Sequence, residues 1–288
     1  MLATEKLIIC VAPTGNMHGK ETNPNLPLQP DEIAEEVYRS WSEGAAIAHI
    51  HARDKNGVPT NDPEVFSEID RRIREKQCDI ILEHTTSPGR TPGVTVDDGP
   101  RSLETRPEMA SINMGVAAGA FRGQEGVRHW TRSFIEKWVK VMFEKGIKPE
   151  MEVYNPGQME EIYILIEKGL LRKPYWVSFV MNMHKTIQAA VRYTPKNLMH
   201  YLDLLLPDSL FSVLGIAEAE LPATTLSILL GGHLRVGLED NVYYRRGVLA
   251  ESNAQLVARA VRLGKELGRE PASPNEAREI LGIPKLQM

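Results

Sequence analysis

The chain has 288 residues, 42% of them hydrophobic and 25% charged, and a formal net charge of -4 at pH 7. Such a composition is typical of a globular protein with a substantial core, and a slightly acidic balance without Lys/Arg blocks argues against a general nucleic-acid binder. Two cysteines, Cys10 and Cys78, exclude a disulfide-rich scaffold and favour a reducing, cytoplasmic location. No run approaches the roughly 18 apolar residues of a membrane span. The N-terminal MLATEKLIICVAPTG predicts a first strand instead of a signal peptide.

Short β-rich runs alternate with helical runs along the whole chain. In chain order we expect a strand at 6–14, a helix at 30–44, a strand at 45–53, a helix at 63–76, a strand at 79–86, a Pro/Gly-rich loop over 87–100, a short helix at 99–105, a strand at 109–115, a helix at 133–146, a strand at 149–155, a helix at 157–169, a strand at 174–182, a helix at 195–206, strands at 209–217 and 233–240, and a helix at 253–268.

This alternation is typical of parallel strands joined by crossover helices. Eight such units in 288 residues match the size of an α/β protein of the (β/α)8 TIM-barrel type. No repeat, linker or low-complexity tract divides the chain, so residues 1–288 are expected to form a single domain. A doubly wound open sheet is the main rival, but no GxGxxG follows the first strand, where a dinucleotide-binding sheet needs its glycines.

Polar residues gather at the predicted C-terminal ends of the strands, where barrels of this type carry their catalytic groups. They include His49, His51, Thr85, Thr86, Ser111, Asn113, Glu152, Arg235, Glu239 and Asp240. One apolar strand ending in polar groups has little meaning, whereas several such strands together predict a site.

His49 and His51 lie two residues apart in AHIHARD, and alternation along a strand places them on one face. Two buried imidazoles need compensation, either from a metal ion or from separate hydrogen bonds. In a closed barrel the last strand neighbours the first, which neighbours the second, so Glu239 can reach both histidines. Two histidines and a carboxylate suit a catalytic Zn²⁺. Considered singly, the histidines could be hydrogen-bonded core residues, Glu239 a solvated loop acid and Arg235 a structural ion-pair partner.

Several segments together resemble the β-keto acid cleavage enzyme family, whose members include enzymes like the 3-keto-5-aminohexanoate cleavage enzyme. The most specific segment is GGHLRVGLEDN at 231–241, with IHAR at 50–53. The likeness also includes NPNLPLQPDEIAEE, RPEMASINMG, MEVYNPGQM, PKNLM and ESNAQLVARAVRLGKELGREPASPNEAREILG. It therefore extends over nearly the whole chain.

The resemblance implies a barrel enzyme that binds one Zn²⁺ per chain and uses acetyl-CoA as co-substrate, converting a β-keto acid into a new acyl-CoA with release of acetoacetate. By matched position, His49, His51 and Glu239 are the expected metal ligands. The expected catalytic residues are Asp240, Arg235 and Thr85, and the expected substrate-binding residues are Thr86, Ser111, Asn113 and Glu152. The family also implies a homo-oligomer, with a tetramer as one option.

These groups suit Claisen chemistry. A Lewis acid that holds the oxygens of a β-keto acid eases loss of the proton between them, and Asp240 is placed to take that proton as general base. Arg235 and the Thr85 hydroxyl are candidate donors to the tetrahedral oxyanion that follows attack on the thioester. The route needs no covalent enzyme intermediate, so neither Cys10 nor Cys78 is expected to be a nucleophile.

The sequence also departs from the family pattern. Ser87-Pro88 follows the strand 79–86 threonines where many members have Gly-Gly, which removes a backbone N–H. Met17 stands where members acting on amino-substituted substrates can carry an acid, which disfavours a cationic substrate tail. Asn182, His184 and Lys185 either reshape the pocket or are ordinary loop residues. The identity of the β-keto acid is therefore left open.

Two other functions remain open. An amidohydrolase-like metal enzyme also uses His-x-His, although that class usually carries it on the first strand. A non-catalytic ligand-binding barrel would need no zinc but leaves the Arg235, Glu239 and Asp240 cluster unexplained. No local motif binds CoA: Arg90, Arg101 and Arg192 are candidates for its phosphates, although each is more often a solvated surface arginine. His84 and His233 are expected to point away from the site or to lie at the other end of the barrel.

Overall fold

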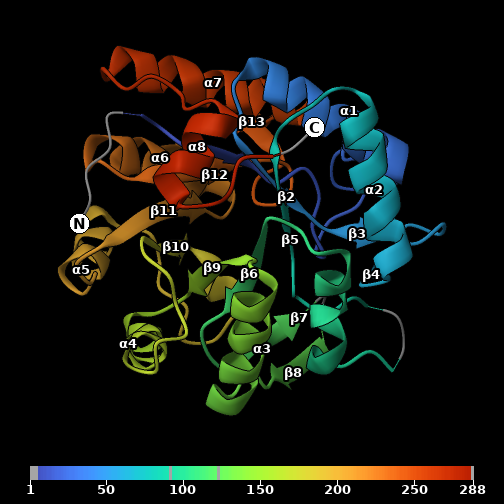
Figure 1. The fold of residues 1–288 in the computed structure, drawn as a ribbon. Helices are drawn as coiled ribbons and strands as arrows, with labels where there is room; N and C mark the ends of the chain where they lie inside the picture. Colours follow the sequence, from blue (N-terminus) through green and yellow to red (C-terminus); the bar gives the residue numbers. More distant parts are fainter. Residues whose placement is uncertain (1–5, 91–92, 122–123, 287–288) are drawn as a thin grey trace.

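The computed structural model describes residues 6–90, 93–121 and 124–286, and its parallel strands close into a ring (Figure 1). The order around the ring is β1-β12-β11-β10-β9-β6-β5-β2. These strands are β1 (Ile9–Val11), β2 (Ile47–Ile50), β5 (Ile81–His84), β6 (Met109–Asn113), β9 (Lys148–Val153), β10 (Tyr175–Met181), β11 (Ser209–Gly215) and β12 (His233–Val236). The predicted (β/α)8 barrel is thereby confirmed.

Helices surround the ring and connect successive strands (Figure 1). They are α1 (Pro30–Glu43), α2 (Pro63–Glu75), α3 (Arg132–Lys145), α4 (Met159–Glu167), α5 (Pro195–Asp203), α6 (Glu220–Leu229) and α7 (Asn253–Glu266), with the 3-10 helix η1 (Val96–Thr105) between β5 and β6. Local signals explain their ends. Proline occupies the first turn of α1, where its missing N–H has no partner to lose, and Gly44 ends the helix at a φ of 115°.

The N-terminal end of the barrel is closed by a C-terminal helix, α8 (Pro274–Leu281). Arg278 donates hydrogen bonds to the Asp79 carbonyl, two residues before β5, and to Glu108, which immediately precedes β6. Beneath it, Ala277 and Leu281 pack with the lowest interior layer of the barrel, which includes Ile8, Ile47, Ile81, Met109, Trp176 and Leu210. Because apolar packing closes the N-terminal end of the barrel, a functional site is expected at the C-terminal end.

Three short hairpins, which the sequence pattern does not predict, extend the loops at that C-terminal end. They are β3 (Ala52–Arg53) with β4 (Pro59–Thr60), β7 (Ala117–Phe121) with β8 (Gln124–Arg128), and β13 (Tyr243–Arg245) with β14 (Val248–Leu249). The prediction of one strand over 45–53 is corrected here, because the barrel strand ends at Ile50 and β3 pairs with β4. The β7–β8 hairpin also contacts the segment after β10, through a bridge between Gly119 and Ile187.

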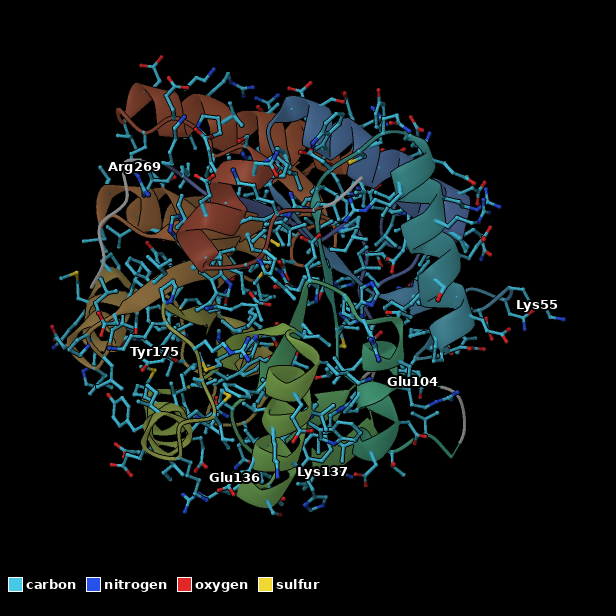
Figure 2. All side chains as sticks on the ribbon, in the orientation of Figure 1. Lys55, Glu104, Glu136, Lys137, Tyr175 and Arg269 are labelled. Atoms are coloured by element: carbon cyan, nitrogen blue, oxygen red, sulfur yellow. The ribbon has the colours of Figure 1, made fainter. Side chains whose placement is uncertain are left out.

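Charged side chains, among them Lys55, Glu104 and Lys137, project from the outer helices and loops (Figure 2). Within the described part of the chain, no helix has the length and apolar character needed to cross a membrane. The first five residues of the segment interpreted as a strand instead of a signal peptide lie outside the described residues, as do residues 91 and 92 of the predicted loop. The expectation of a single domain over 1–288 stays a prediction.

Candidate active site

A cavity of about 340 Å³ opens among the C-terminal ends of the strands. Eight of the predicted site residues line it: His49, His51, Thr85, Asn113, Glu152, Arg235, Glu239 and Asp240. Thr86 and Ser111 do not lie among the lining residues. Residues from five strands or the loops after them therefore meet at one place.

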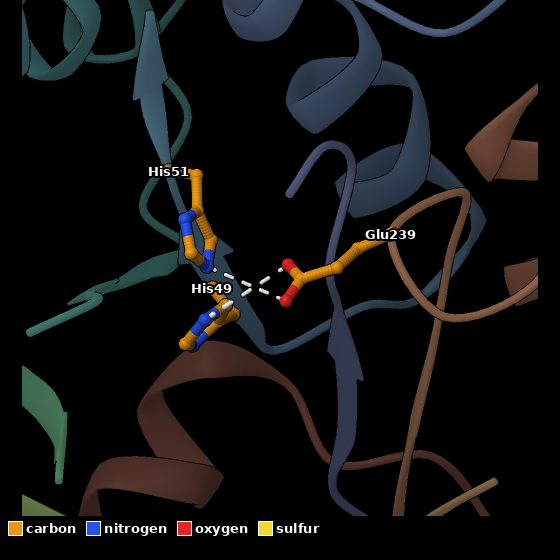
Figure 3. A group of neighbouring side chains, drawn as sticks. All are labelled: His49, His51 and Glu239. Carbon is orange, nitrogen blue, oxygen red and sulfur yellow. Dashed lines mark ion pairs between the residues drawn. The ribbon is translucent and has the colours of Figure 1, made fainter. Parts of the chain in front are cut away.

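The side chains of His49, His51 and Glu239, which line this cavity, point toward one another (Figure 3). Glu239 Oε1 lies 3.4 Å from His51 Nε2, and Glu239 Oε2 lies 3.9 Å from His49 Nε2. Their candidate ligand atoms all lie within 4.8 Å of one another. Gly15 allows this approach, because a Cβ at that position would collide with the Glu239 side chain.

The other ring nitrogen of each histidine already has a partner. His49 Nδ1 lies 2.7 Å from Glu83 Oε1, and His51 Nδ1 lies 3.0 Å from Asn16 Oδ1. With the proton on each Nδ1, both Nε2 lone pairs face Glu239. Asn16 is itself oriented by donating from Nδ2 to the carbonyl of Pro88 at 3.0 Å. Pro88, which removes an N–H relative to the family pattern, thus supplies an acceptor here.

The protonation states of this group suit a divalent metal ion. Burial lowers the pKa of His49 well below its usual value, which keeps the imidazole neutral. Burial opposes ionisation of Glu239, but Arg235 and the two histidines outweigh it and hold the pKa of this carboxyl well below its usual value. Glu239 Oε2 is buried without a hydrogen-bond partner among the described residues. The two Nε2 atoms, an ionised carboxylate and an unpartnered oxygen fit the donor set of Zn²⁺.

Arg235 organises the acids beside the candidate metal site. Its Nε and Nη2 each donate to one carboxylate oxygen of Asp240 at 2.8 Å, and Nη2 also donates to Glu239 Oε1 at 2.7 Å. Nη1 donates to Glu152 Oε1 at 3.3 Å. The guanidinium is 2% exposed, so these contacts are shielded from solvent. One cation therefore fixes three carboxylates, one from β9 and two from the loop after β12.

Burial raises the pKa of Asp240 to about 6, although Arg235 opposes the change. Burial likewise raises the pKa of Glu152 to about 8, with the charge of Glu150 adding to the effect. A carboxyl with a pKa near neutrality can both take and return a proton under physiological conditions. Asp240 has this property, faces the cavity and is next in sequence to a candidate metal ligand.

Of the remaining predicted residues, Thr85 and Asn113 line the cavity, whereas Thr86 and Ser111 lie behind its wall. The Thr85 hydroxyl accepts from the Ser87 N–H at 3.0 Å, and Asn113 donates to the Tyr154 hydroxyl, which donates to Glu152. Thr86, on the opposite side of its strand from Thr85, donates to the carbonyl of Ser111 at 2.6 Å. Thr86 and Ser111 do not line the cavity, and their contact with substrate stays a prediction.

Asn16, Glu83 and Tyr154 contact the site although none of them is among the predicted site residues; of the three, Asn16 and Tyr154 lie at predicted strand ends. The sequence could have indicated Glu83, because it lies two residues before Thr85 and therefore shares a strand face with a predicted site residue. Near the end of β10, Asn182, His184 and Lys185 are not among the lining residues, which instead include Met183, Thr186 and Ile187.

The other residues considered in the sequence lie partly in the cavity and partly away from it. Arg90 and Met17 line the cavity, whereas Arg101 is exposed and lies 3.9 Å from Glu104. Arg192 is exposed. His84 points away from the cavity, with Nε2 2.9 Å from Asp70 of α2, and His233 accepts from the Ile8 N–H at the opposite end of the barrel. Cys10 and Cys78 are buried, and burial raises the pKa of both thiols, which disfavours the reactive thiolate.

Fold and site together define a (β/α)8-barrel enzyme with a candidate metal centre beside an acid–base group at the C-terminal face of the barrel. A family model described as beta-keto acid cleavage enzyme matches residues 6–283. The chain belongs to the β-keto acid cleavage enzyme family, which confirms the resemblance seen in the sequence.

Curated relatives agree with this assignment over full length. The chain is 38% identical to a 3-keto-5-aminohexanoate cleavage enzyme of Fusobacterium nucleatum subsp. nucleatum, covering 98% of this chain and 99% of the relative. It is 31% identical to a 3-oxoadipate:acetyl-CoA acetyltransferase of Cupriavidus necator, covering 99% and 98%. Among solved structures, a binary complex of ObcA with oxaloacetate is similar in fold, with a TM-score of 0.71, 19% identity, and coverage of 90% of this chain and 68% of ObcA.

Proposed function

We propose that this protein is a zinc-dependent β-keto acid cleavage enzyme that transfers the CoA group of acetyl-CoA. The overall change is R–CO–CH2–COO⁻ + acetyl-CoA → R–CO–CoA + acetoacetate. The observation that carries the proposal is the convergence of His49, His51 and Glu239 next to the buried Arg235–Asp240 pair. Relatives named for acetyl-CoA-dependent conversion of β-keto acids support the same reaction class.

Zinc bound by His49, His51 and Glu239 would act as the Lewis acid that stabilises the negative charge on the substrate oxygens. Asp240 removes a proton from the carbon between ketone and carboxylate, and that carbon attacks the acetyl thioester. Arg235 and the Thr85 hydroxyl then donate to the oxyanion. The oxyanion collapses and expels CoA thiolate, which attacks the ketone carbon. Cleavage of the original C–C bond then gives the new thioester and the acetoacetate carbanion, to which Asp240 returns the proton.

Neither alternative function is favoured by an observation in the structure. Membership of the family argues against an amidohydrolase-like hydrolase, and the Arg235 network has no evident use in a non-catalytic ligand-binding barrel. A cytoplasmic location and a homo-oligomeric state remain predictions.

The test is a coupled assay of zinc-loaded protein with acetyl-CoA and a panel of β-keto acids, with acetoacetate as the readout. The expected result is acetoacetate formation that depends on acetyl-CoA and is lost in His49→Ala and Asp240→Asn. Retained zinc binding without acetoacetate from any substrate would refute the reaction and leave the metal site.

A further inference from the structure

Glu83 lies directly behind the candidate metal site. It comes from β5, is fully buried, and its Oε1 lies 2.7 Å from His49 Nδ1. On the other side of the same ring, His49 Nε2 faces Glu239 at 3.9 Å. A single imidazole is therefore held between a carboxylate that faces the cavity and a carboxylate that solvent does not reach.

Glu83 is in turn held from β9 and β10. Glu150 lies beside Glu83, and its Oε2 lies 3.7 Å from His49 Nδ1. The Ser178 hydroxyl donates to Glu150 Oε1. Glu150 and Ser178 are buried like Glu83, so this chain of contacts beneath the site is closed to water. A buried carboxyl with two such neighbours has little freedom to turn away from His49.

His49, Glu83 and Glu150 also have the spacing of a possible second metal site. The short distance argues against this interpretation. Two atoms that bind one tetrahedral zinc at about 2.0–2.2 Å lie roughly 3.3–3.6 Å apart, whereas His49 Nδ1 and Glu83 Oε1 are 2.7 Å apart. That distance is typical of a hydrogen bond.

We propose that Glu83 is a positioning residue for the metal centre. It accepts the Nδ1 proton of His49, which fixes the tautomer whose Nε2 lone pair faces the metal, and Glu150 with Ser178 keeps it in place. A carboxylate behind a metal-binding histidine orients the ring and strengthens it as a ligand. The inference rests on the metal site proposed above.

The experiment measures the zinc dissociation constant of the full chain by chelator competition. Glu83→Gln keeps an acceptor but removes the acidic group, and Glu83→Leu removes both. The expected dissociation constants rise in the order wild type, Glu83→Gln, Glu83→Leu, by about 10- to 100-fold for the leucine variant. The matched control is Glu36→Gln, the same change at a buried glutamate of α1 whose partners are Arg39 and Asn253, for which zinc binding stays close to wild type because Glu36 contacts neither His49 nor Glu83.

A second readout is the tautomer of His49, observed by ¹⁵N NMR of the zinc-free chain. The expected state is Nδ1–H in the wild type and a mixture in Glu83→Leu, a change that a general packing defect would not produce. Because the wild-type measurement needs no variant, a protonated Nε2 there would overturn the proposal even if a variant fails to fold. Equal zinc affinity in wild type and Glu83→Leu would overturn it as well. A wild-type chain that binds no zinc would refute the metal site itself.

Discussion

Arg235 holds Asp240 through two hydrogen bonds, one to each carboxylate oxygen, both 2.8 Å long. The same guanidinium donates to Glu239, the residue next to Asp240. Arginine suits this position because its planar fork binds a carboxylate at two points. The candidate base and the candidate metal ligand are thus fixed relative to one another by a single cation.

Because the candidate base and the candidate metal ligands are different residues, variants can test proton transfer and metal binding separately. Asp240→Asn keeps the size of the side chain but removes the base, so kcat is expected to fall by about 10²- to 10⁴-fold. Zinc content should stay at the wild-type level, because Glu239 and both histidines are unchanged. Glu239→Gln is the matched variant, and its expected defect is loss of zinc. Nearly full activity in zinc-loaded Asp240→Asn would remove Asp240 from its proposed role.

Arg235 also stabilises the fold. Arg235→Met leaves the carboxylates of Glu152, Glu239 and Asp240 without their shared cation, and removing one partner of a buried ion pair costs about 3–5 kcal/mol. We expect a loss of this size in urea unfolding of the metal-free chain, and a smaller loss for Arg235→Lys, which keeps charge without the fork. Arg101→Met, at an exposed arginine, is the control. Equal stability of Arg235→Met and Arg101→Met would contradict the prediction.

The barrel was predictable because eight apolar strands with polar C-terminal ends alternate with helices along the chain. The cluster of His49, His51 and Glu239 was predictable because His49 and His51 share a strand face and the last strand lies close to theirs in a closed barrel. Glu83 was not selected, because its contact with His49 depends on the register between β2 and β5, in which these two residues are partners. The alternation of side chains along an extended segment also explains why Thr86 does not line the cavity. Thr85 faces inward, so the next residue points to the other side.

Asn16 is expected to support His51 as Glu83 supports His49, but with a neutral acceptor. Asn16→Ala removes the partner of His51 Nδ1, so zinc affinity is expected to fall by about tenfold, less than for Glu83→Leu. Chelator competition gives the comparison. Asn25→Ala, at another side-chain amide of a nearby loop, should leave zinc binding unchanged. An Asn16→Ala chain with wild-type affinity would show that the amide does not contribute.

The cavity favours a β-keto acid with an apolar tail. Its wall includes Val180, Met183, Leu214 and Ile216, and within the described residues its lining acids are those that bind Arg235. Each added methylene should therefore raise kcat/KM by about fourfold until the cavity is full, from roughly 0.8 kcal/mol per buried CH2.

Matched alkyl and amino-substituted β-keto acids of equal length provide the test of that preference. The ammonium-bearing analogue is expected to react more slowly, because an apolar wall cannot replace its hydration. Leu214→Asn should narrow the difference between the two substrates. A higher kcat/KM for the amino-substituted compound in the wild type would show that the tail binds elsewhere.

At the opposite end of the barrel, His233 should make stability depend on pH. Its Nδ1 accepts from the Ile8 N–H at 3.0 Å, and burial, with a smaller contribution from Arg269, lowers its pKa from 6.5 to about 3. The folded protein holds this ring neutral, so the stabilisation is fully present above pH 6.5 and is lost as pH falls toward 3. One such group changes the free energy of unfolding by at most about 1.4 kcal/mol per pH unit.

Urea unfolding at pH 7 and pH 5 measures this dependence. His233→Asn keeps an acceptor for Ile8 but cannot titrate, so its loss of stability between the two pH values should be smaller than that of the wild type by about 2 kcal/mol. His200→Asn, at an exposed histidine, is the control and should behave as the wild type. An equal pH dependence in wild type and His233→Asn would mean that His233 takes up a proton in the folded barrel. A doubly protonated ring cannot accept the Ile8 N–H through Nδ1, so this result would contradict the hydrogen bond between them.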